Sequence, residues 1–312
     1  MAGFRVVVTD QVFPDVEVER ALIEQAGGTL EVASGDRTDV LALARDADAL
    51  LNTYFPLSAA DLAGLSRCRI IARYGIGVDN IDLVAARMRG IAVTNVPDYC
   101  VEEVALHTVA LLLATVRRVP AGDALVRAGG WGVGGLGEIH RLSTRTVGLL
   151  GYGRIARLVA DVLRPLVRQV LVHDPYLAGA GPDRSVELAE LYAESDIVSV
   201  HCPLTDKTRG MIDAAALAAM RPDVTVVNTS RGPIVVLADL LDALRSGQVG
   251  AAALDVFDAE PPPAAALDKV PNLLVTPHSA FYSLEAIGES QRKATGQVLA
   301  ALRGEPLAYQ VT

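Results

Sequence analysis

The segment Leu149–Ala156, with the sequence LLGYGRIA, decides the fold of this chain. Its glycines are spaced as in the phosphate-binding turn that joins a strand to a helix in dinucleotide-binding domains, with alanine at the third position. Gly151 suits a tight turn, Gly153 lets the backbone approach a pyrophosphate, and Ala156 permits close packing of helix on strand. An apolar strand pattern precedes the turn and a helical pattern follows it, so the helix N-terminus can supply amide donors to anionic oxygens.

A carboxylate at the end of the next strand pattern indicates which dinucleotide this turn would hold. The run VLVHD ends in Asp174, whose side chain can accept hydrogen bonds from the ribose hydroxyls of NAD. The same charge repels the additional phosphate of NADP, and the following residues, Pro175 and Tyr176, offer no arginine to neutralise it. We therefore predict NAD as the cofactor. The alternative, a glycine turn without a ligand, is disfavoured by the combination of turn and acid.

The glycine turn lies near the middle of the chain, and the residues before it already alternate between strand and helix patterns. Strand-like runs occur there in FRVVVTD, ALLNTY, CRIIARYG and GIAVTNVP. A second alternation runs from the turn through QVLVHDPY, SDIVSVHCPL, VTVVNTSRG, GAAALDVF and NLLVTPHSAF. Such alternation predicts an α/β fold with parallel sheets. Between the two series, residues 101–117 have a helical pattern, and the glycine-rich residues 120–143 are expected to form a loop or an irregular crossing segment.

Composition excludes several classes of protein. The chain has 312 residues, of which 51% are hydrophobic and 21% charged, which is typical of a packed fold with room for two domains. Its net charge of −9 argues against a nucleic-acid partner. The most apolar run, residues 104–116, is too short to span a membrane, and no signal peptide is expected. Three scattered cysteines indicate no disulfide framework and no metal site, which favours a cytoplasmic location.

Catalytic residues are expected at the carboxyl ends of the strands, where α/β sheets bind their ligands. His278 follows the run VTP and precedes small residues, so its imidazole can face a cleft. Glu260 follows ALDVF and would fix the tautomer of His278 if the two strand ends are neighbours. Such a histidine can protonate the alkoxide formed by hydride transfer. Arg231, after VVNTS, offers a planar cation for a substrate carboxylate. Each residue alone could be structural, but the three together favour catalysis.

At this point the sequence resembles the D-isomer-specific 2-hydroxyacid dehydrogenase family over nearly its whole length. The resemblance rests on GVDNIDL, VGLLGYGRIAR, VHDPY, HCPLTDKTRGMID, VVNTSRG, AALDVFDAEPP and NLLVTPHSAF. It implies two Rossmann-like or flavodoxin-like domains, with a doubly wound cofactor domain inserted into a smaller substrate domain. Residues 1–100 and 282–312 would form the substrate domain, and residues 101–281 the NAD-binding domain. The active site would then lie in a cleft that closes around both ligands.

The resemblance also implies a role for individual residues. Arg231 would bind and polarise the 2-oxo acid, Glu260 would support the histidine, and His278 would be the general acid and base. Members of the family typically form homodimers through the cofactor domain. The predicted cofactor-binding residues are Gly151, Tyr152, Gly153, Arg154, Ile155, Asp174, Cys202, Pro203, Thr208, Thr229, Ser230, Arg231, Asp255, His278 and Ala280. The predicted substrate-binding residues are Tyr54, Ile76, Gly77, Arg231, His278 and Phe281.

Two alternatives to a simple 2-hydroxyacid dehydrogenase stay open. The segments NVPDYCVEEVALHT and TPHSAFYSLEA are most similar to the C-terminal-binding-protein-like branch, which includes NAD(H)-sensing corepressor scaffolds. Phe281, however, replaces a tryptophan of that branch, and Ile76 stands where phosphite dehydrogenases carry lysine. The other alternative is a 3-phosphoglycerate dehydrogenase, in which Arg73 would face a phosphate. We expect Arg73 instead to be a surface or strand-edge charge.

Overall fold

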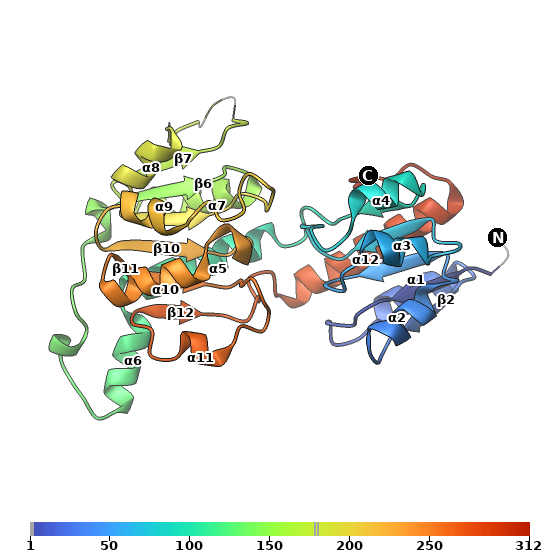
Figure 1. Ribbon diagram of the computed structural model, residues 1–312, viewed down its shortest axis with the longest axis horizontal. Helices are drawn as coiled ribbons and strands as arrows, with labels where there is room; N and C mark the ends of the chain where they lie inside the picture. The colour runs from blue at the N-terminus through green and yellow to red at the C-terminus, as the bar shows by residue number, and fades with distance from the viewer. Residues whose placement is uncertain (1–2, 178, 180) are drawn as a thin grey trace. The chain divides into compact units, whose positions relative to one another are not determined.

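The computed structural model describes residues 3–177, 179 and 181–312, and the chain divides into two compact units. The first comprises Met1–Cys100 and Tyr282–Thr312, and the second comprises Val101–Phe281. Each unit contains a parallel β-sheet covered by helices (Figure 1). The prediction of an α/β fold with parallel sheets is therefore confirmed. The second unit is inserted into the chain of the first.

The first unit is built on a five-stranded sheet with the order β2-β1-β3-β4-β5, a doubly wound arrangement. Its strands are short apolar runs, as expected where both faces of a parallel sheet are covered. The strands are β1 (Arg5–Val8), β2 (Thr29–Val32), β3 (Ala49–Asn52), β4 (Ile70–Arg73) and β5 (Ala92–Thr94). The helices are α1 (Glu17–Gln25), α2 (Arg37–Ala44), α3 (Ala59–Ala63), α4 (Leu83–Met88) and α12 (Leu284–Arg303). The apolar residues of α2, α3 and α4 share one core with the sheet, while α12 packs on α1, β3 and β4.

A buried carboxylate joins α1 to α12 inside the first unit. Glu19 is fully buried, and its carboxylate accepts hydrogen bonds from the Tyr74 hydroxyl at 2.7 Å and the Gln291 amide at 3.0 Å. Burial raises the pKa of Glu19, and these two hydrogen bonds only partly oppose the shift. The charged form of Glu19 is therefore unfavourable in the folded unit.

We expect Glu19→Gln to raise the thermal midpoint by about 2–4 °C near pH 8. Because the pKa of Glu19 is higher in the folded than in the unfolded chain, wild-type stability rises as the pH falls through the folded pKa. Glutamine resembles the protonated acid, and the Tyr74 hydroxyl can accept its amide hydrogen. The advantage of the variant should shrink on acidification, which thermal unfolding across a pH series would show. A variant less stable than wild type at alkaline pH would contradict this account.

The second unit contains a seven-stranded parallel sheet with the order β12-β11-β10-β9-β6-β7-β8. The strands are β6 (Thr146–Leu150), β7 (Gln169–His173), β8 (Arg184–Ser185), β9 (Ile197–Val200), β10 (Val224–Asn228), β11 (Val249–Leu254) and β12 (Leu273–Val275). The helices are α5 (Val101–Val116), α6 (Val119–Arg127), α7 (Arg154–Leu163), α8 (Leu188–Glu194), α9 (Ala214–Ala219), α10 (Leu237–Ser246) and α11 (Ala264–Leu267). The strand order reverses between β6 and β9, which creates the crevice where such sheets bind ligands.

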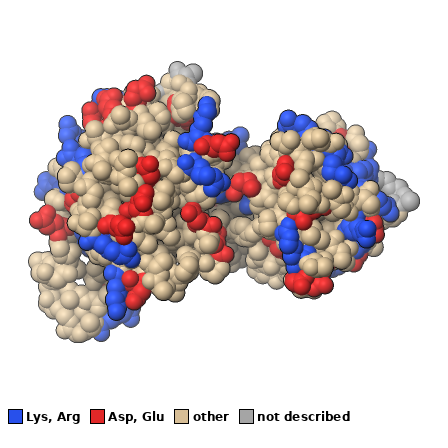
Figure 2. Space-filling view, in the orientation of Figure 1, with Lys and Arg blue, Asp and Glu red and all other residues tan. Residues whose placement is uncertain are grey.

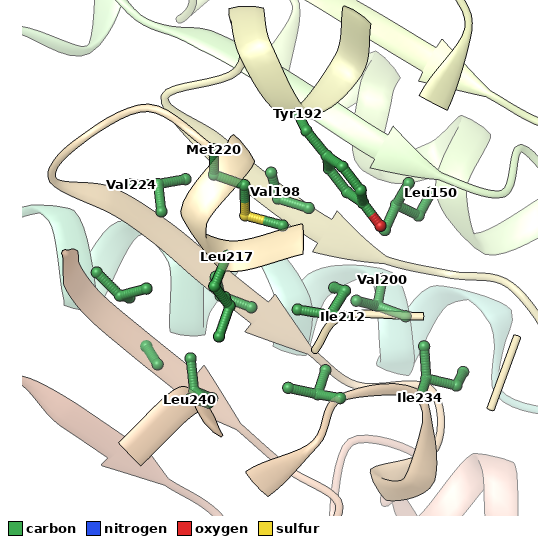
Figure 3. Packing of buried hydrophobic residues seen from close by; sticks show 14 of the residues in the cluster. Leu150, Tyr192, Val198, Val200, Ile212, Leu217, Met220, Val224, Ile234 and Leu240 are labelled. Carbon is green, nitrogen blue, oxygen red and sulfur yellow. The ribbon is translucent and has the colours of Figure 1, made fainter. Parts of the chain in front are cut away.

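Two apolar cores fix the sheet of the second unit. One lies between the sheet and helices α8, α9 and α10 (Figure 3). Its buried side chains include Leu150, Tyr192, Val198, Val200, Leu217 and Leu240. The other core is formed by α5 and α7 against the same sheet, with Leu112 and Leu163 fully buried. Burial on both sides holds the strand ends, and therefore the loops that follow them, in a fixed register.

The prediction of a loop over residues 120–143 is wrong for its first part, because α6 (Val119–Arg127) is a helix. Pro120 lies in its first turn, where the missing amide hydrogen costs nothing. Gly122 lowers the helix propensity of this stretch, which explains why the sequence pattern pointed to a loop. Two short 3₁₀ turns, η1 (Val133–Gly135) and η2 (Leu142–Thr144), follow. No residue of α6 is buried, and the helix projects away from the sheet of its own unit (Figure 1).

Two features concern the predictions that the protein binds neither nucleic acid nor a membrane: the distribution of charged side chains and the length of the apolar helices. Basic and acidic side chains are interspersed on the face of each unit that Figure 2 shows. Among the described residues, no single helix has the length and apolarity to cross a membrane. Only α5 and α6 together, bent by 58° at the break between them, meet both criteria. The apolar side of α5 contributes to the core of its unit.

Candidate active site

The glycine turn lies at the crevice between β6 and β9. Gly151 has a φ of +89°, a conformation that favours glycine, and its amide donates to the His173 carbonyl at 2.8 Å. A Cβ at Gly151 would lie 2.8 Å from the backbone nitrogen of Cys202, closer than real side chains approach. Glycine at this position is therefore required both by the turn and by the loop after β9.

Gly153 forms the N-cap of α7, and no side chain caps this helix end. A Cβ built on Gly153 would have no protein atom within 4 Å, so the surface above the turn is open. Arg154 and Ile155 begin the helix, and Ala156 is fully buried against the core. Uncapped amides at the N-terminus of a ten-residue helix, beside an open glycine surface, fit the pyrophosphate of a dinucleotide.

Asp174 follows β7 and is half-buried beside the same turn. One of its oxygens accepts the Tyr152 amide and the other the Tyr176 amide, each at 2.9 Å. A carboxylate oxygen accepts more than one hydrogen bond, so Asp174 retains capacity for ribose hydroxyls. The ring of Tyr152 is only 4% exposed and lies under the guanidinium of Arg157, so this residue can offer a ligand little beyond its backbone.

The remaining predicted cofactor residues form turns at the ends of β9 and β10. The Ser230 hydroxyl donates to the Cys202 carbonyl at 2.6 Å, and the Thr208 hydroxyl donates to the Pro203 carbonyl at 2.6 Å. Thr229 is buried, with its hydroxyl 2.7 Å from that of Thr108 on α5. Burial raises the pKa of the Cys202 thiol to about 11, which keeps it protonated and unreactive. These side chains shape the crevice by holding its turns.

His278 and Glu260 are brought together at the ends of β12 and β11. The Nδ1 atom of His278 lies 2.6 Å from Oε2 of Glu260, whose Oε1 accepts the Phe257 amide at 2.9 Å. Because a carboxylate only accepts, Nδ1 carries the proton, and Nε2 is the ring nitrogen that can gain and lose one. The ring of Phe281 meets that of His278 edge to face, with centroids 6.2 Å apart. Both residues of the His278–Glu260 pair line a hollow of about 360 Å³.

Arg231 lies on the neighbouring loop after β10. Its carbonyl accepts the Asn228 side-chain amide at 2.9 Å, and its guanidinium donates to the Ser230 carbonyl at 2.9 Å. The next residue, Gly232, is packed against the chain before Glu260, since a Cβ there would lie 2.0 Å from the Phe257 carbonyl carbon. Burial acts to raise the pKa of Glu260, but the bonds from His278 and Phe257 and the charges of His278 and Arg231 hold it below its usual value.

We expect Glu260→Gln to destabilise the protein by about 1 kcal/mol near neutral pH. The pKa of Glu260 is lower in the folded than in the unfolded chain, so its contribution is present above the unfolded pKa and is lost as the pH falls through the folded pKa. The deficit of the variant should therefore be constant in neutral solution and disappear in acid. Thermal unfolding of both proteins across that range would measure it, and a deficit that persists in acid would show that the carboxylate charge is not responsible.

Asp255, at the end of β11, organises the loop that carries His278. Its carboxylate is fully buried and accepts the Thr276 hydroxyl at 2.6 Å and the amides of Ser279 and Ala280, each at 2.9 Å. Its carbonyl accepts the His278 amide at 2.8 Å. Asp255 therefore has a structural role that the sequence did not indicate, and its contact with a cofactor stays a prediction. Thr276 was not predicted as a functional residue, although it lies in the segment NLLVTPHSAF, two positions before His278.

His201 is another histidine at a strand end, but its chemistry differs from that of His278. It follows β9, and its Nε2 lies 2.9 Å from the Ser199 hydroxyl. Burial lowers the pKa of His201 to about 4, so the ring is neutral in ordinary buffers. A neutral imidazole is poorly suited to donate a proton, whereas the Nδ1 atom of His278 lies 2.6 Å from the Glu260 carboxylate.

In the first unit, the predicted substrate residues follow β3 and β4. Tyr54 is 39% exposed, on a turn whose amides are held by the Asp10 carboxylate. The half-buried Ile76 has its carbonyl fixed by the Asn95 side chain at 2.7 Å, and Gly77 follows it. Arg73 is only 8% exposed, and β4 lies between β3 and β5, so the prediction of a surface or strand-edge charge is wrong. The carbon of its guanidinium lies 5.9 Å from the centre of the Tyr54 ring.

The sequence of the second unit matches that of a known family of proteins. Residues 109–280 match the model of a family described as D-isomer specific 2-hydroxyacid dehydrogenase, NAD binding domain. The match covers more than half of the chain. The chain belongs to this family.

Relatives across this dehydrogenase family are similar over most of the chain. The D-3-phosphoglycerate dehydrogenase of Mycobacterium leprae is 39% identical over 278 residues, covering 86% of this chain and 52% of that protein. The glyoxylate reductase of Aeropyrum pernix is 35% identical, with 96% of this chain and 93% of that protein covered. The crystal structure of TT0316 protein from Thermus thermophilus is similar with a TM-score of 0.90 and 33% identity, covering 99% of this chain and all of that one. The chain spans about half the length of the phosphoglycerate dehydrogenases that it matches.

Proposed function

We propose that this chain is an NAD(H)-dependent D-2-hydroxyacid dehydrogenase that interconverts a 2-oxo acid and the D-2-hydroxy acid. The observation that carries the proposal is the 2.6 Å contact between His278 Nδ1 and the Glu260 carboxylate, with Arg231 on the adjacent loop. A histidine oriented by a carboxylate, next to a permanent cation, suits proton transfer to a bound carboxylic substrate.

The glycine turn and the amides of α7 would hold the pyrophosphate of NAD, and Asp174 would hold its adenosine ribose. Bound NADH supplies the hydride for reduction, and NAD accepts it for oxidation. The charge of Asp174 favours NAD over NADP, because a ribose phosphate would meet a carboxylate already fixed by two amides.

Proton transfer is the contribution of the chain's own residues to the reaction. Arg231 would bind the substrate carboxylate and polarise its 2-oxo group, which orients the carbonyl for reduction. His278 would donate the Nε2 proton to the developing alkoxide, while Glu260 stabilises the imidazolium through Nδ1. In the reverse direction, His278 would accept the hydroxyl proton as a general base.

Four further residues are proposed for substrate binding. The edge-to-face contact with His278 supports Phe281 as part of the pocket wall. Tyr54, Ile76 and Gly77 follow the carboxyl ends of strands in the first unit, where ligands of α/β sheets bind. We propose that the backbone of Ile76 and Gly77 binds the substrate carboxylate and that Tyr54 limits substrate size.

The direct test is a panel of 2-oxo acids followed by NADH absorbance. Pyruvate, glyoxylate, hydroxypyruvate, phosphohydroxypyruvate and bulkier 2-oxo acids should be compared with NADH and with NADPH, and the product resolved by chirality. We expect turnover with at least one acid, a D product and a preference for NADH. Tight NADH binding without turnover on any acid would instead support the NAD(H)-sensing scaffold of the C-terminal-binding-protein-like branch.

A second candidate activity is oxidation of 3-phosphoglycerate, which the name of the Mycobacterium leprae relative suggests. The buried position of Arg73, beside the ring of Tyr54, places a permanent cation near a predicted substrate residue. The panel distinguishes the two, because a phosphoglycerate dehydrogenase should turn over phosphohydroxypyruvate far better than hydroxypyruvate.

We also propose a homodimer formed through the second unit. The side chains of Val119, Val126, Trp131 and Val133, in α6 and the turn after it, are 53–90% exposed. Such a patch on a projecting helix is typical of a surface that another protein covers. Light scattering should show a dimer for wild type, and Trp131→Glu should weaken it; a wild-type monomer would exclude this assembly. The cytoplasmic location stays a prediction.

A further inference from the structure

His107 connects the middle of α5 to the loop that carries His278. Its Nε2 atom lies 3.1 Å from the Thr276 hydroxyl and 3.6 Å from the Asp255 carboxylate. The Thr276 hydroxyl lies 2.6 Å from the same carboxylate oxygen of Asp255. The side chain of His107 is 25% exposed, so its ring is largely enclosed at this contact. Three polar groups from α5, β11 and the end of β12 therefore form one chain of hydrogen bonds.

The number of protons on each group determines which atom donates and which accepts in these hydrogen bonds. A hydroxyl has one proton, and Thr276 gives it to Asp255, because the carboxylate can only accept. The Thr276 oxygen can then only accept from His107, so Nε2 of His107 carries a hydrogen. The donor on α5 thus fixes the orientation of the Thr276 hydroxyl, and the hydroxyl in turn supports the carboxylate that receives the Ser279 and Ala280 amides.

The backbone that these bonds hold is strained. His278 has a φ of +53°, a left-handed conformation that residues other than glycine seldom adopt and that costs about 1 kcal/mol or more. It persists because the His278 amide donates to the carbonyls of Asp255 and Thr276, at 2.8 and 3.1 Å, and because the next two amides donate to the Asp255 carboxylate. Loosening Asp255 or Thr276 would let the loop relax and move the imidazole.

We infer that His107 is a positioning residue, which acts through Thr276 and Asp255 to hold His278 in the strained conformation needed for proton transfer. The inference rests on the proposed dehydrogenase function. It differs from a simple packing role, which an apolar side chain of similar size could fill. The required property is a hydrogen-bond donor at the place of Nε2.

Three variants of His107 distinguish the effect of its hydrogen-bond donor from the effect of the size of its ring. His107→Gln places an amide nitrogen close to the position of Nε2, His107→Asn places it one bond short, and His107→Leu removes it. We expect the Leu and Asn variants to lower kcat about 10- to 100-fold, since small displacements of a reacting group have effects of that size. The Gln variant should stay close to wild type. The KM for the 2-oxo acid and the affinity for NADH should change little in all three.

A spectroscopic measurement tests the same point without turnover. In protein labelled with ¹⁵N-histidine, the proton between His278 Nδ1 and Glu260 should give a downfield resonance, which His278→Gln identifies by removing it. We expect this resonance in wild type and His107→Gln, and its loss in His107→Leu and His107→Asn. If wild type turns over no 2-oxo acid, the proposed function fails and the resonance alone decides the inference.

A double-mutant cycle with Thr276→Val completes the test. Because His107 and Thr276 belong to one chain of bonds, the double variant with His107→Leu should be no more impaired than either single variant. A resonance and a kcat that are the same in His107→Leu as in wild type would overturn the inference, as would equal losses in the Gln and Leu variants. Should the Leu variant fail to fold, the Gln and Asn variants, which differ by one methylene, make the same comparison.

Discussion

Replacement of His278 by Gln is expected to lower kcat for reduction of the 2-oxo acid by about 10²- to 10⁴-fold, with NADH binding nearly unchanged. Glutamine can still donate a hydrogen bond, but it cannot release a proton to an alkoxide. The partner Glu260 would keep its hydrogen bond from the Phe257 amide, so the loop before it should stay in place. Steady-state kinetics with NADH, together with fluorescence titration of NADH binding, would measure both quantities.

His278→Asn provides a matched control for the backbone at this position. Asparagine enters the left-handed region more readily than glutamine, so it should be the more stable of the two variants at a φ of +53°. Both should lose activity to a similar extent, because neither transfers a proton. Activity that is retained in either variant would remove His278 from the role of general acid and base. Activity that follows thermal stability instead would point to the loop conformation as the cause.

Much of the second unit could be predicted because its signals are local in sequence. The turn at Gly151 and Gly153 depends on residues that are neighbours in the chain, and its conformation follows from the absence of a side chain. The pairing of His278 with Glu260 was predictable because consecutive strands of an α/β sheet end at the same edge, which brings their loops together.

The features that could not be predicted depend on contacts between distant residues. His107 and Thr276 are 169 positions apart, and the segments that contain them give no indication that they pair, so only the packing of α5 on the sheet reveals their bond. Arg73 was expected to be a surface or strand-edge charge, and arginine is seldom buried, yet the residue is only 8% exposed and its guanidinium lies 5.9 Å from the centre of the Tyr54 ring. At such positions, tertiary packing outweighs the average tendency of a residue type to be exposed or buried.

The helix α6 shows how local propensity can also mislead. Gly122 and Pro120 both reduce the average helix propensity of this stretch, and none of its side chains is buried in the core of the unit. Proline in a first turn is favourable, however, and Arg127 pairs with Asp123 one turn before it at 2.8 Å. The average helix propensity of this stretch is therefore less informative than the position that each residue takes within the helix.

The second large effect is expected for Gly232→Ala, a change that adds only one methyl group. A Cβ at this position would lie 2.0 Å from the Phe257 carbonyl carbon and 2.5 Å from the Asp258 nitrogen. Both are backbone atoms, so no rotamer change can relieve the overlap. Either the loop of Arg231 or the loop of Glu260 must move, and we expect kcat/KM to fall by about 10²-fold or more. Overpacking should also cost about 1–3 kcal/mol of stability, measured by denaturant unfolding.

Gly296→Ala is the matched control, because it is the same substitution in an open position. Gly296 lies exposed in α12, with no atom within 4 Å of a built Cβ, so alanine there should stabilise the protein by about 0.5–1 kcal/mol. Its kcat/KM should equal that of wild type. If Gly232→Ala lost stability but kept full kcat/KM, the two loops could separate without affecting catalysis, and the close approach of Gly232 to the backbone of Phe257 and Asp258 would not be needed for the reaction. A loss of kcat/KM at unchanged affinity for NADH would instead place the effect at the substrate and proton-transfer residues, because the backbone atoms that the added Cβ would meet belong to Phe257 and Asp258.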